Sequence, residues 1–172
     1  MLLNREFSDA ELSALRLDGD AFAVHGSTLS LDSPDVLSTR VSLARGDAPK
    51  RMVVDRLSAA WVWGATEVRP QPAMICADLR ERTSKQLGEW APHKTYRFVD
   101  GDVWATDGGP VLSPWRTLLH VLRFDSAEHP EVLSALVELN QLAITELADA
   151  IIKRVHPTAR RRYLEPLRAL SL

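Results

Sequence analysis

The side chains that most often carry out chemistry are few in this sequence and lie far apart. The single cysteine, Cys76, stands between Ile75 and Ala77 in an apolar run, which predicts a buried strand residue rather than a nucleophile. One cysteine also excludes an internal disulfide and a multi-cysteine metal site. The five histidines have no carboxylate or cysteine at metal-ligand spacing, and no two are four residues apart: His25, His93, His120, His129 and His156.

For His120, two interpretations stay open. It follows Arg116 by about one helical turn, where a general base is conceivable, but an ordinary histidine between packed elements is the commoner case. The sequence contains no nucleophile elbow, dinucleotide fingerprint or phosphate-binding loop. Asp100 and Asp102 belong to a turn, in which solvated carboxylates are the default. We therefore expect no catalytic residue, no cofactor and no metal.

The composition is that of a folded globular protein. Of 172 residues, 45% are apolar and 26% charged, so the chain can bury a core without staples. No stretch approaches the roughly 18 apolar residues of a membrane span, and the first residues are too short in their apolar part for a signal peptide. We expect a cytoplasmic protein with no membrane partner.

Positive charge is concentrated at the C-terminal end. Residues 150–172 carry six Lys and Arg against one Glu, a net of +5, whereas the overall net charge is −2. Arg160-Arg161-Arg162 is compatible with a solvated helix face, with phosphate contacts or with an acidic partner protein. The five tryptophans are similarly open between core or interface packing and the stacking of nucleic-acid bases: Trp61, Trp63, Trp90, Trp104 and Trp115.

Local signals predict an α+β protein. Ser8-Asp9-Ala10-Glu11 forms a capping box that opens a helix to about Leu17, and residues 21–31 alternate around Gly26-Ser27 as a β-hairpin. Helix plus hairpin is the outline of half a winged helix. Further helices are expected from Ser33-Pro34 and over 57–63. Short strands at 52–54, 73–77, 95–99, 103–106 and 110–112 predict a small central sheet, mixed or mostly antiparallel, and helices follow Ser113, Pro130, Thr145 and Pro157.

Two blocks resemble the AbiEi-type antitoxin and transcriptional-regulator family of type IV toxin–antitoxin systems. Residues 52–64, a short strand followed by Ser58-Ala59-Ala60 and Gly64, look like its shared-helix signature. Residues 110–119, a strand that enters a helix through Ser113-Pro114-Trp115-Arg116-Thr117, look like its second block. Residues 8–31 look like its N-terminal helix and wing in shortened form, so the resemblance covers most of residues 8–125. It divides the chain into a reduced winged-helix-like segment, 1–50, and an AbiEi-like α+β domain with C-terminal helices, 51–172.

The resemblance implies a non-enzymatic DNA-associated regulator or antitoxin. Its partners would be duplex DNA and a nucleotidyltransferase-like toxin or another protein, and a homodimer would be needed to present enough charge. The expected nucleic-acid contacts are Arg5, Arg16, His25, Ser27 and Thr28 in the N-terminal segment, assisted by Lys153, Arg154, Arg160, Arg161 and Arg162. The alternative is a protein-interaction module with a degenerate winged helix that holds a partner through its tryptophans and Arg160–Arg162. The residues of the two blocks themselves are expected to be structural.

Overall fold

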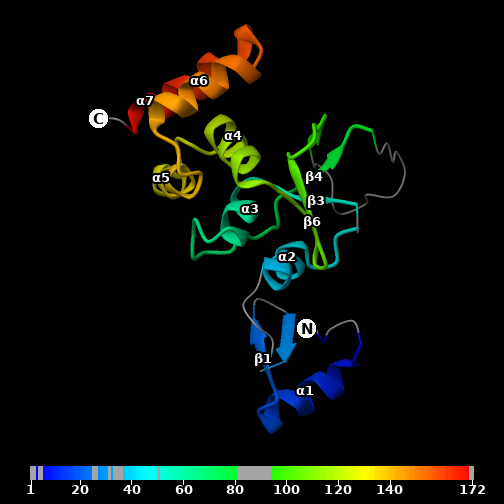
Figure 1. Ribbon diagram of the computed structural model, residues 1–172. Helices are drawn as coiled ribbons and strands as arrows, with labels where there is room; N and C mark the ends of the chain where they lie inside the picture. Colours follow the sequence, from blue (N-terminus) through cyan, green and yellow to red (C-terminus); the bar gives the residue numbers. More distant parts are fainter. Residues whose placement is uncertain are drawn as a thin grey trace.

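The computed structural model describes residues 3, 6–24, 27–30, 32, 37–49, 51–80 and 94–170 (Figure 1). The elements are, in chain order, α1 (Asp9–Asp18), β1 (Ala21–Val24), β2 (Ser27–Ser30), α2 (Leu37–Arg45), β3 (Val53–Val54), α3 (Arg56–Val62), β4 (Ile75–Asp78), β5 (Lys94–Tyr96), β6 (Val103–Thr106), β7 (Gly109–Leu112), α4 (Pro114–Phe124), α5 (Pro130–Leu139), α6 (Ile144–Arg154), the 3-10 helix η2 (Pro157–Ala159) and α7 (Arg161–Ala169). The protein is therefore α+β, as predicted.

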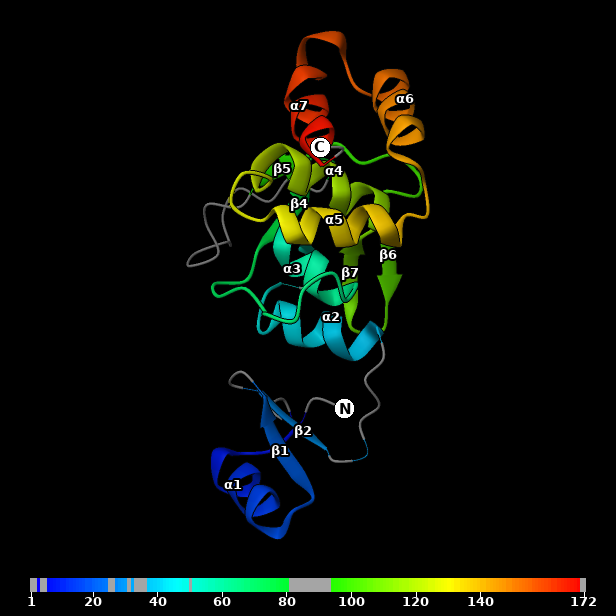
Figure 2. The same cartoon turned by 90° about the vertical axis from the view of Figure 1, so that its left-hand side faces the viewer.

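The N-terminal elements form a small unit of their own. Ser8 and Glu11 make the predicted reciprocal capping box at the start of α1, and Gly19 ends the helix in the left-handed conformation at φ 83°. β1 and β2 pair as the predicted antiparallel hairpin. Leu3, Leu12 and Ala21 form a separate small core beneath it. Figures 1 and 2 show this unit at one end of an elongated molecule, with α6 and α7 at the other.

The central sheet is mixed, with the strand order β5-β4-β3-β7-β6. β3 pairs antiparallel to β4 and parallel to β7, β4 is parallel to β5, and β6 and β7 form an antiparallel hairpin. Two of the four pairings are parallel, so of the two predicted alternatives the mixed sheet is confirmed and the mostly antiparallel one is wrong. Strands of two to four residues carry too little pattern to encode the direction of pairing.

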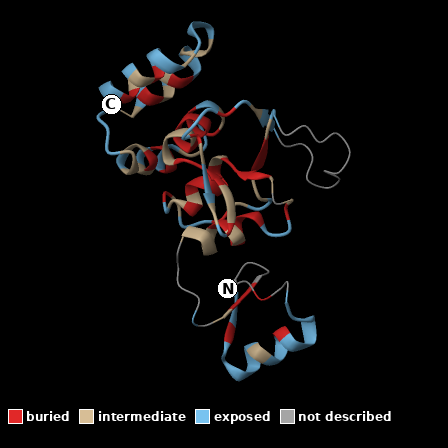
Figure 3. Cartoon of the chain, turned by 45° about the vertical axis from the view of Figure 1, so that its right-hand side comes forward, coloured by how far each residue is buried: buried red, intermediate tan, exposed pale blue. Residues whose placement is uncertain are grey.

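Two main cores hold the rest of the chain together. One joins the sheet to α2 and α3 and contains Val41, Val54, Cys76 and Val111, all with no exposed surface. The other is helical: α4 lies between α3 and α5, and α6 and α7 close over it with Leu147, Ile151 and Leu167 buried. Figure 3 shows the buried residues concentrated in the sheet, α3 and α4.

Helix α2 belongs to the central unit by its packing. It contacts α3 and β7 and contributes Val41 and Ala44 to the sheet core. The division predicted at residue 50 cuts α2 off from the elements on which it packs, because the boundary was drawn from a family resemblance rather than from contacts. The helix start predicted at Ser33-Pro34 lies outside the described residues.

Candidate functional site

Asp55 is the centre of a buried polar network. It caps α3, because its Oδ1 accepts the Arg56 backbone N–H at 2.7 Å. The same oxygen accepts from His120 Nδ1 at 2.6 Å, and both side chains are only 3% exposed. The thiol of Cys76 also hydrogen-bonds to Asp55, and burial together with this carboxylate raises the pKa of the thiol. Cys76 is therefore a protonated core residue, in line with the prediction.

The hydrogen bonds of His120 fix its tautomer. Arg116 Nε–H donates to His120 Nε2 at 3.1 Å, and because a guanidinium has no acceptor atom, this ring nitrogen must accept. The hydrogen on the ring is then the one on Nδ1, which donates to Asp55. On its other side, Arg116 lies 3.5 Å from Asp102 Oδ2. A continuous polar chain thus runs from Asp55 through His120 and Arg116 to Asp102.

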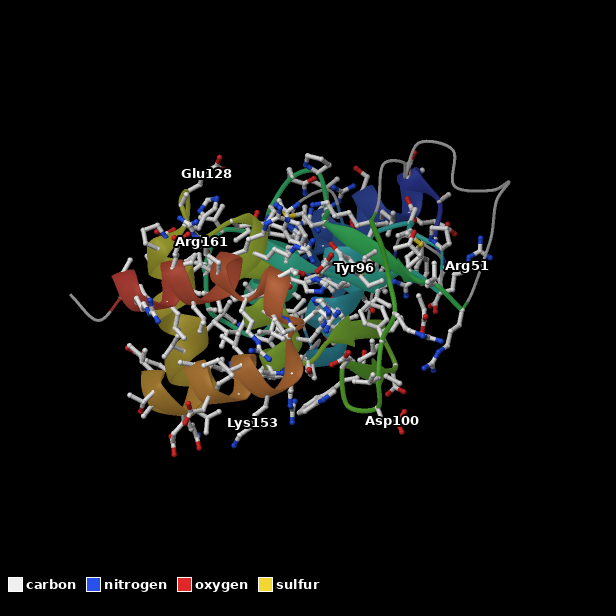
Figure 4. All side chains as sticks on the ribbon, turned by 90° about the horizontal axis from the view of Figure 1, so that it is seen from above. Arg51, Tyr96, Asp100, Glu128, Lys153 and Arg161 are labelled. Atoms are coloured by element: carbon white, nitrogen blue, oxygen red, sulfur yellow. The ribbon has the colours of Figure 1, made fainter. Side chains whose placement is uncertain are left out.

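Aromatic rings cover the part of this polar network that surrounds His120. The ring of Tyr96 lies 4.3 Å from that of His120 and Phe124 lies at 6.2 Å, edge on. Figure 4 shows Tyr96 near the middle of the molecule. Its hydroxyl is buried without a hydrogen-bond partner among the described residues, and burial first, then the Asp55 charge, raises the pKa of that hydroxyl.

The arrangement brings His120, Arg116 and a carboxylate together, a combination of side chains that catalytic sites also contain. A general base needs an unprotonated nitrogen that a substrate can reach. Here both ring nitrogens of His120 are occupied and its side chain is buried, so the geometry is that of a structural crosslink between α3 and α4. The sequence indicated Arg116 and His120 but missed Asp55, whose only local signal was its position before a helix.

A second crosslink ties the first residue of α3 to the end of α4. Arg56 Nε donates to Asp125 Oδ2 at 2.8 Å, and a further guanidinium N–H pairs with Asp125 Oδ1. This bidentate pair raises the pKa of Arg56. The backbone of Arg56 has φ 49°, which costs a side-chain-bearing residue energy, and the flanking contacts of Asp55 and Asp125 hold it there.

An open cleft of about 540 Å³ lies between the turn before β6, the start of α4, the end of α5 and α6. Its walls include Trp104, Trp115 and Leu142, with Asp100 and Arg154 as charged groups. Trp104 is 47% exposed and meets Trp63 edge on at 5.1 Å, and Arg154 covers Trp115 at 5.5 Å. Asp55 and His120 do not line this cleft, whereas Asp102 does.

The prediction that both turn carboxylates at the rim of the cleft are solvated is wrong for Asp102. The sequence favoured solvated carboxylates for Asp100 and Asp102. Asp100 is exposed, but Asp102 is 6% exposed, accepts the Val99 backbone N–H at 3.0 Å and faces Arg116. The Asp102 carboxylate therefore stabilises the turn through its hydrogen bond to the backbone.

Of the N-terminal residues expected to contact DNA, the structure describes the side chains of Arg16 and Thr28. Arg16 lies on α1 and donates through Nε to the backbone oxygen of Leu12 at 3.0 Å. Thr28 is 3% exposed, which leaves little of its surface for contact with a ligand. Arg5, His25 and the side chain of Ser27 lie outside the described residues. Residues 6–20 carry five acids against Arg16 alone, which is the wrong balance for phosphate.

The C-terminal basic residues are distributed over the end of α6, the residue after η2 and the start of α7. Lys153, Arg154 and Arg162 are exposed, and Figure 4 shows Lys153 directed away from the body of the molecule. Arg160 donates to the Val155 carbonyl at 3.0 Å, and Arg161 pairs with Glu165 at 2.7 Å. Lys153 and Arg162 are therefore the clearest candidates for external contacts.

No known family model and no curated protein sequence matches this chain. Among the described residues, no group of three or more His, Cys, Asp or Glu side chains is placed to hold a metal ion. In the same part of the chain, every helix is too short or too polar to cross a membrane.

Proposed function

We propose that this chain is a non-enzymatic regulator or antitoxin-like protein of the AbiEi type that associates with duplex DNA through its C-terminal helices. The observation that carries the proposal is the exposed positive charge of α6 and α7, in a region of net charge +5. Nucleic-acid binders gain most of their affinity by neutralising phosphates with such side chains. The buried state of His120 supports a role in binding rather than in catalysis.

Salt dependence of duplex binding tests this proposal. The affinity for a mixed-sequence duplex should fall steeply between low and moderate salt, because each phosphate contact contributes about −0.9 to the logarithmic slope. Replacing Lys153 and Arg162 together with alanine should reduce that slope by roughly two. Fluorescence anisotropy at a series of salt concentrations measures both quantities.

Arg161→Ala is the matched control on the same helix. Its guanidinium is already paired with Glu165, so its removal should change the slope by less than the loss of either exposed cation. A chain that binds no duplex even at low salt would end the DNA-associated proposal.

The second candidate is a protein-interaction module, which the cleft between β6, α4, α5 and α6 favours. Tryptophan side chains are typical anchors of protein interfaces, and Trp104 is 47% exposed. Leu142, 40% exposed, adds apolar surface to the same cleft. The partner would be a nucleotidyltransferase-like toxin or another protein. An adjacent gene for such an enzyme would be the cheapest supporting observation.

Co-expression separates the two candidates. If the product of the adjacent gene stops growth and this chain restores it, Trp104→Ser should remove the rescue through loss of an interface anchor. Lys153→Ala with Arg162→Ala should keep it. The reverse pattern would assign the protective effect to the basic helices instead of the cleft.

A further inference from the structure

Three cationic side chains from three different elements surround the ring of Phe124. Lys94 on β5 has its Nζ 3.4 Å from the ring centroid, Arg123 on α4 lies at 4.9 Å and Arg56 on α3 at 5.4 Å. The residues are 29 or more positions apart except for Arg123 and Phe124, so only the fold assembles the group.

The charges in this group are not balanced. Arg56 is neutralised by its bidentate pair with Asp125. Lys94 and Arg123 are exposed, and neither forms an ion pair with a carboxylate of the described residues. Both positive charges therefore lie against the same ring, that of Phe124, without an ion pair to a described carboxylate.

Lys94 lies in surroundings that disfavour its positive charge. Its pKa is lowered, first by partial desolvation and then by the charge of Arg56, with a smaller contribution from Arg123. Asp55 and Asp125 act in the opposite direction but do not offset these effects. An anion placed at this surface would relieve the repulsion.

Contact with the Phe124 ring also leaves the N–H groups of Lys94 and Arg123 available as hydrogen-bond donors. A cation over an aromatic face is held electrostatically, so the contact with Phe124 orients Lys94 and Arg123 without consuming their N–H groups in ordinary hydrogen bonds. An ammonium and a guanidinium that contact the same ring suit a tetrahedral anion with several acceptor oxygens. A phosphate group, with its higher charge, fits this pair better than a carboxylate.

We propose that Lys94 and Arg123, oriented by Phe124, form a binding site for a phosphate group. The phosphate of a free nucleotide and that of a nucleic-acid backbone share this chemistry. The site does not depend on the proposed function, since it would take free phosphate even if the chain never contacted DNA. It is also separate from the basic helices α6 and α7.

Titration of the full chain with inorganic phosphate tests the site. Binding should be saturable in the millimolar range and should raise the pKa of Lys94, followed through the ε-methylene signals in NMR spectra. Lys94→Gln and Arg123→Gln should each weaken phosphate binding roughly tenfold, because each removes one charge-assisted contact. Both side chains are exposed, so the fold should survive. Arg168→Gln, which removes one exposed charge from α7, is the control and should leave phosphate binding unchanged.

Two further ligands distinguish the sources of the phosphate. A mononucleotide that binds at least as tightly as inorganic phosphate, with the same loss in both variants, identifies a nucleotide site. If instead only duplex DNA shows an enhanced, Lys94-dependent affinity, the ligand is the nucleic-acid backbone. Duplex binding that depends on Lys153, together with phosphate binding that Lys94→Gln and Arg123→Gln leave unchanged, would keep the DNA proposal intact while removing this one. Unsaturable phosphate binding, or equal affinity in both variants and the control, also overturns it.

Discussion

His120 makes its two ring nitrogens unavailable by bonding one to Asp55 and the other to Arg116. The network fixes the positions of four side chains, which come from the turn before β6, the residue that caps α3, and α4. Its role in the protein is therefore conformational. A buried network of this kind stabilises only while every member has its partner. Each residue in it should consequently be sensitive to deletion.

Asp55→Ala should be among the most destabilising single changes. It removes the acceptor of the His120 Nδ1–H and the cap of α3 while both sites stay buried, so we expect a loss of about 3 kcal/mol in the free energy of unfolding. Urea denaturation followed by circular dichroism measures it. Asp100→Ala, at an exposed rim position, should stay within about 0.5 kcal/mol. Equal effects of the two changes would contradict the network.

Cys76 offers a chemical readout of the same region. Its side chain has no exposed surface and its pKa is raised, so very little thiolate is available in the folded protein. A thiol reagent such as DTNB should therefore react slowly in native buffer and release one equivalent per chain in denaturant. Rapid reaction of the native protein at mildly alkaline pH would show that the core around Asp55 opens readily.

At the scale of elements, α2 is seated on the turn between β6 and β7. A Cβ at Gly108 would overlap the backbone oxygen of Ser38 and lie 2.8 Å from Ser42 Oγ, so the backbone of the turn lies directly against the backbone of the helix. The guanidinium of Arg45 completes the contact by donating to the Gly108 carbonyl at 2.9 Å. This docking sets where the hairpin lies against the sheet.

Gly108→Ala should therefore destabilise the protein by at least about 2 kcal/mol through overpacking. Gly101 is the matched comparison, because a Cβ there meets nothing within 4 Å and only its φ of 85° opposes substitution. Gly101→Ala should cost about 1 kcal/mol. Chemical denaturation measures the loss in the free energy of unfolding for both variants. A smaller loss for Gly108→Ala than for Gly101→Ala would show that α2 can shift away from the added methyl group at little energetic cost.

Elements of this protein were predictable where their signals are local. The capping box of Ser8 and Glu11, the alternation of residues 21–30 and the Ser113-Pro114 start of α4 each depend on neighbours within a few positions, and the structure has all three. Strand direction was not predictable, because β3 pairs with β7 across more than fifty residues. The polar chain was missed for the same reason: His120 and Asp55 are 65 positions apart.

The group around Phe124 shows the same limit for a candidate site. Lys94, Arg123 and Arg56 each stand among mixed charges in the sequence and give no basic run. Arg160-Arg161-Arg162 does give a run, yet two of its three members are engaged within the protein. A count of charges along the chain therefore overstates the contribution of the run and overlooks the assembled group.

At the scale of the whole molecule, the N-terminal unit has its own core and the remaining elements have theirs. Leu3, Leu12 and Ala21 share no core with the sheet or with the C-terminal helices. Stability of the larger part should accordingly be independent of the unit formed by α1, β1 and β2.

Removal of residues 1–32 tests this independence and the proposed DNA contact together. The free energy of unfolding of the remaining chain, measured with urea, should stay the same within about 0.5 kcal/mol, because α2, the sheet and the helical core are all retained. The salt slope of duplex binding should also persist, since the exposed cations of α6 and α7 remain and the removed unit carries more acid than base. Denaturation and anisotropy titrations of the shortened chain measure the two outcomes. If the shortened chain keeps its stability but loses duplex binding, the contact belongs to the N-terminal unit around Arg16, and the C-terminal helices are a solvated surface.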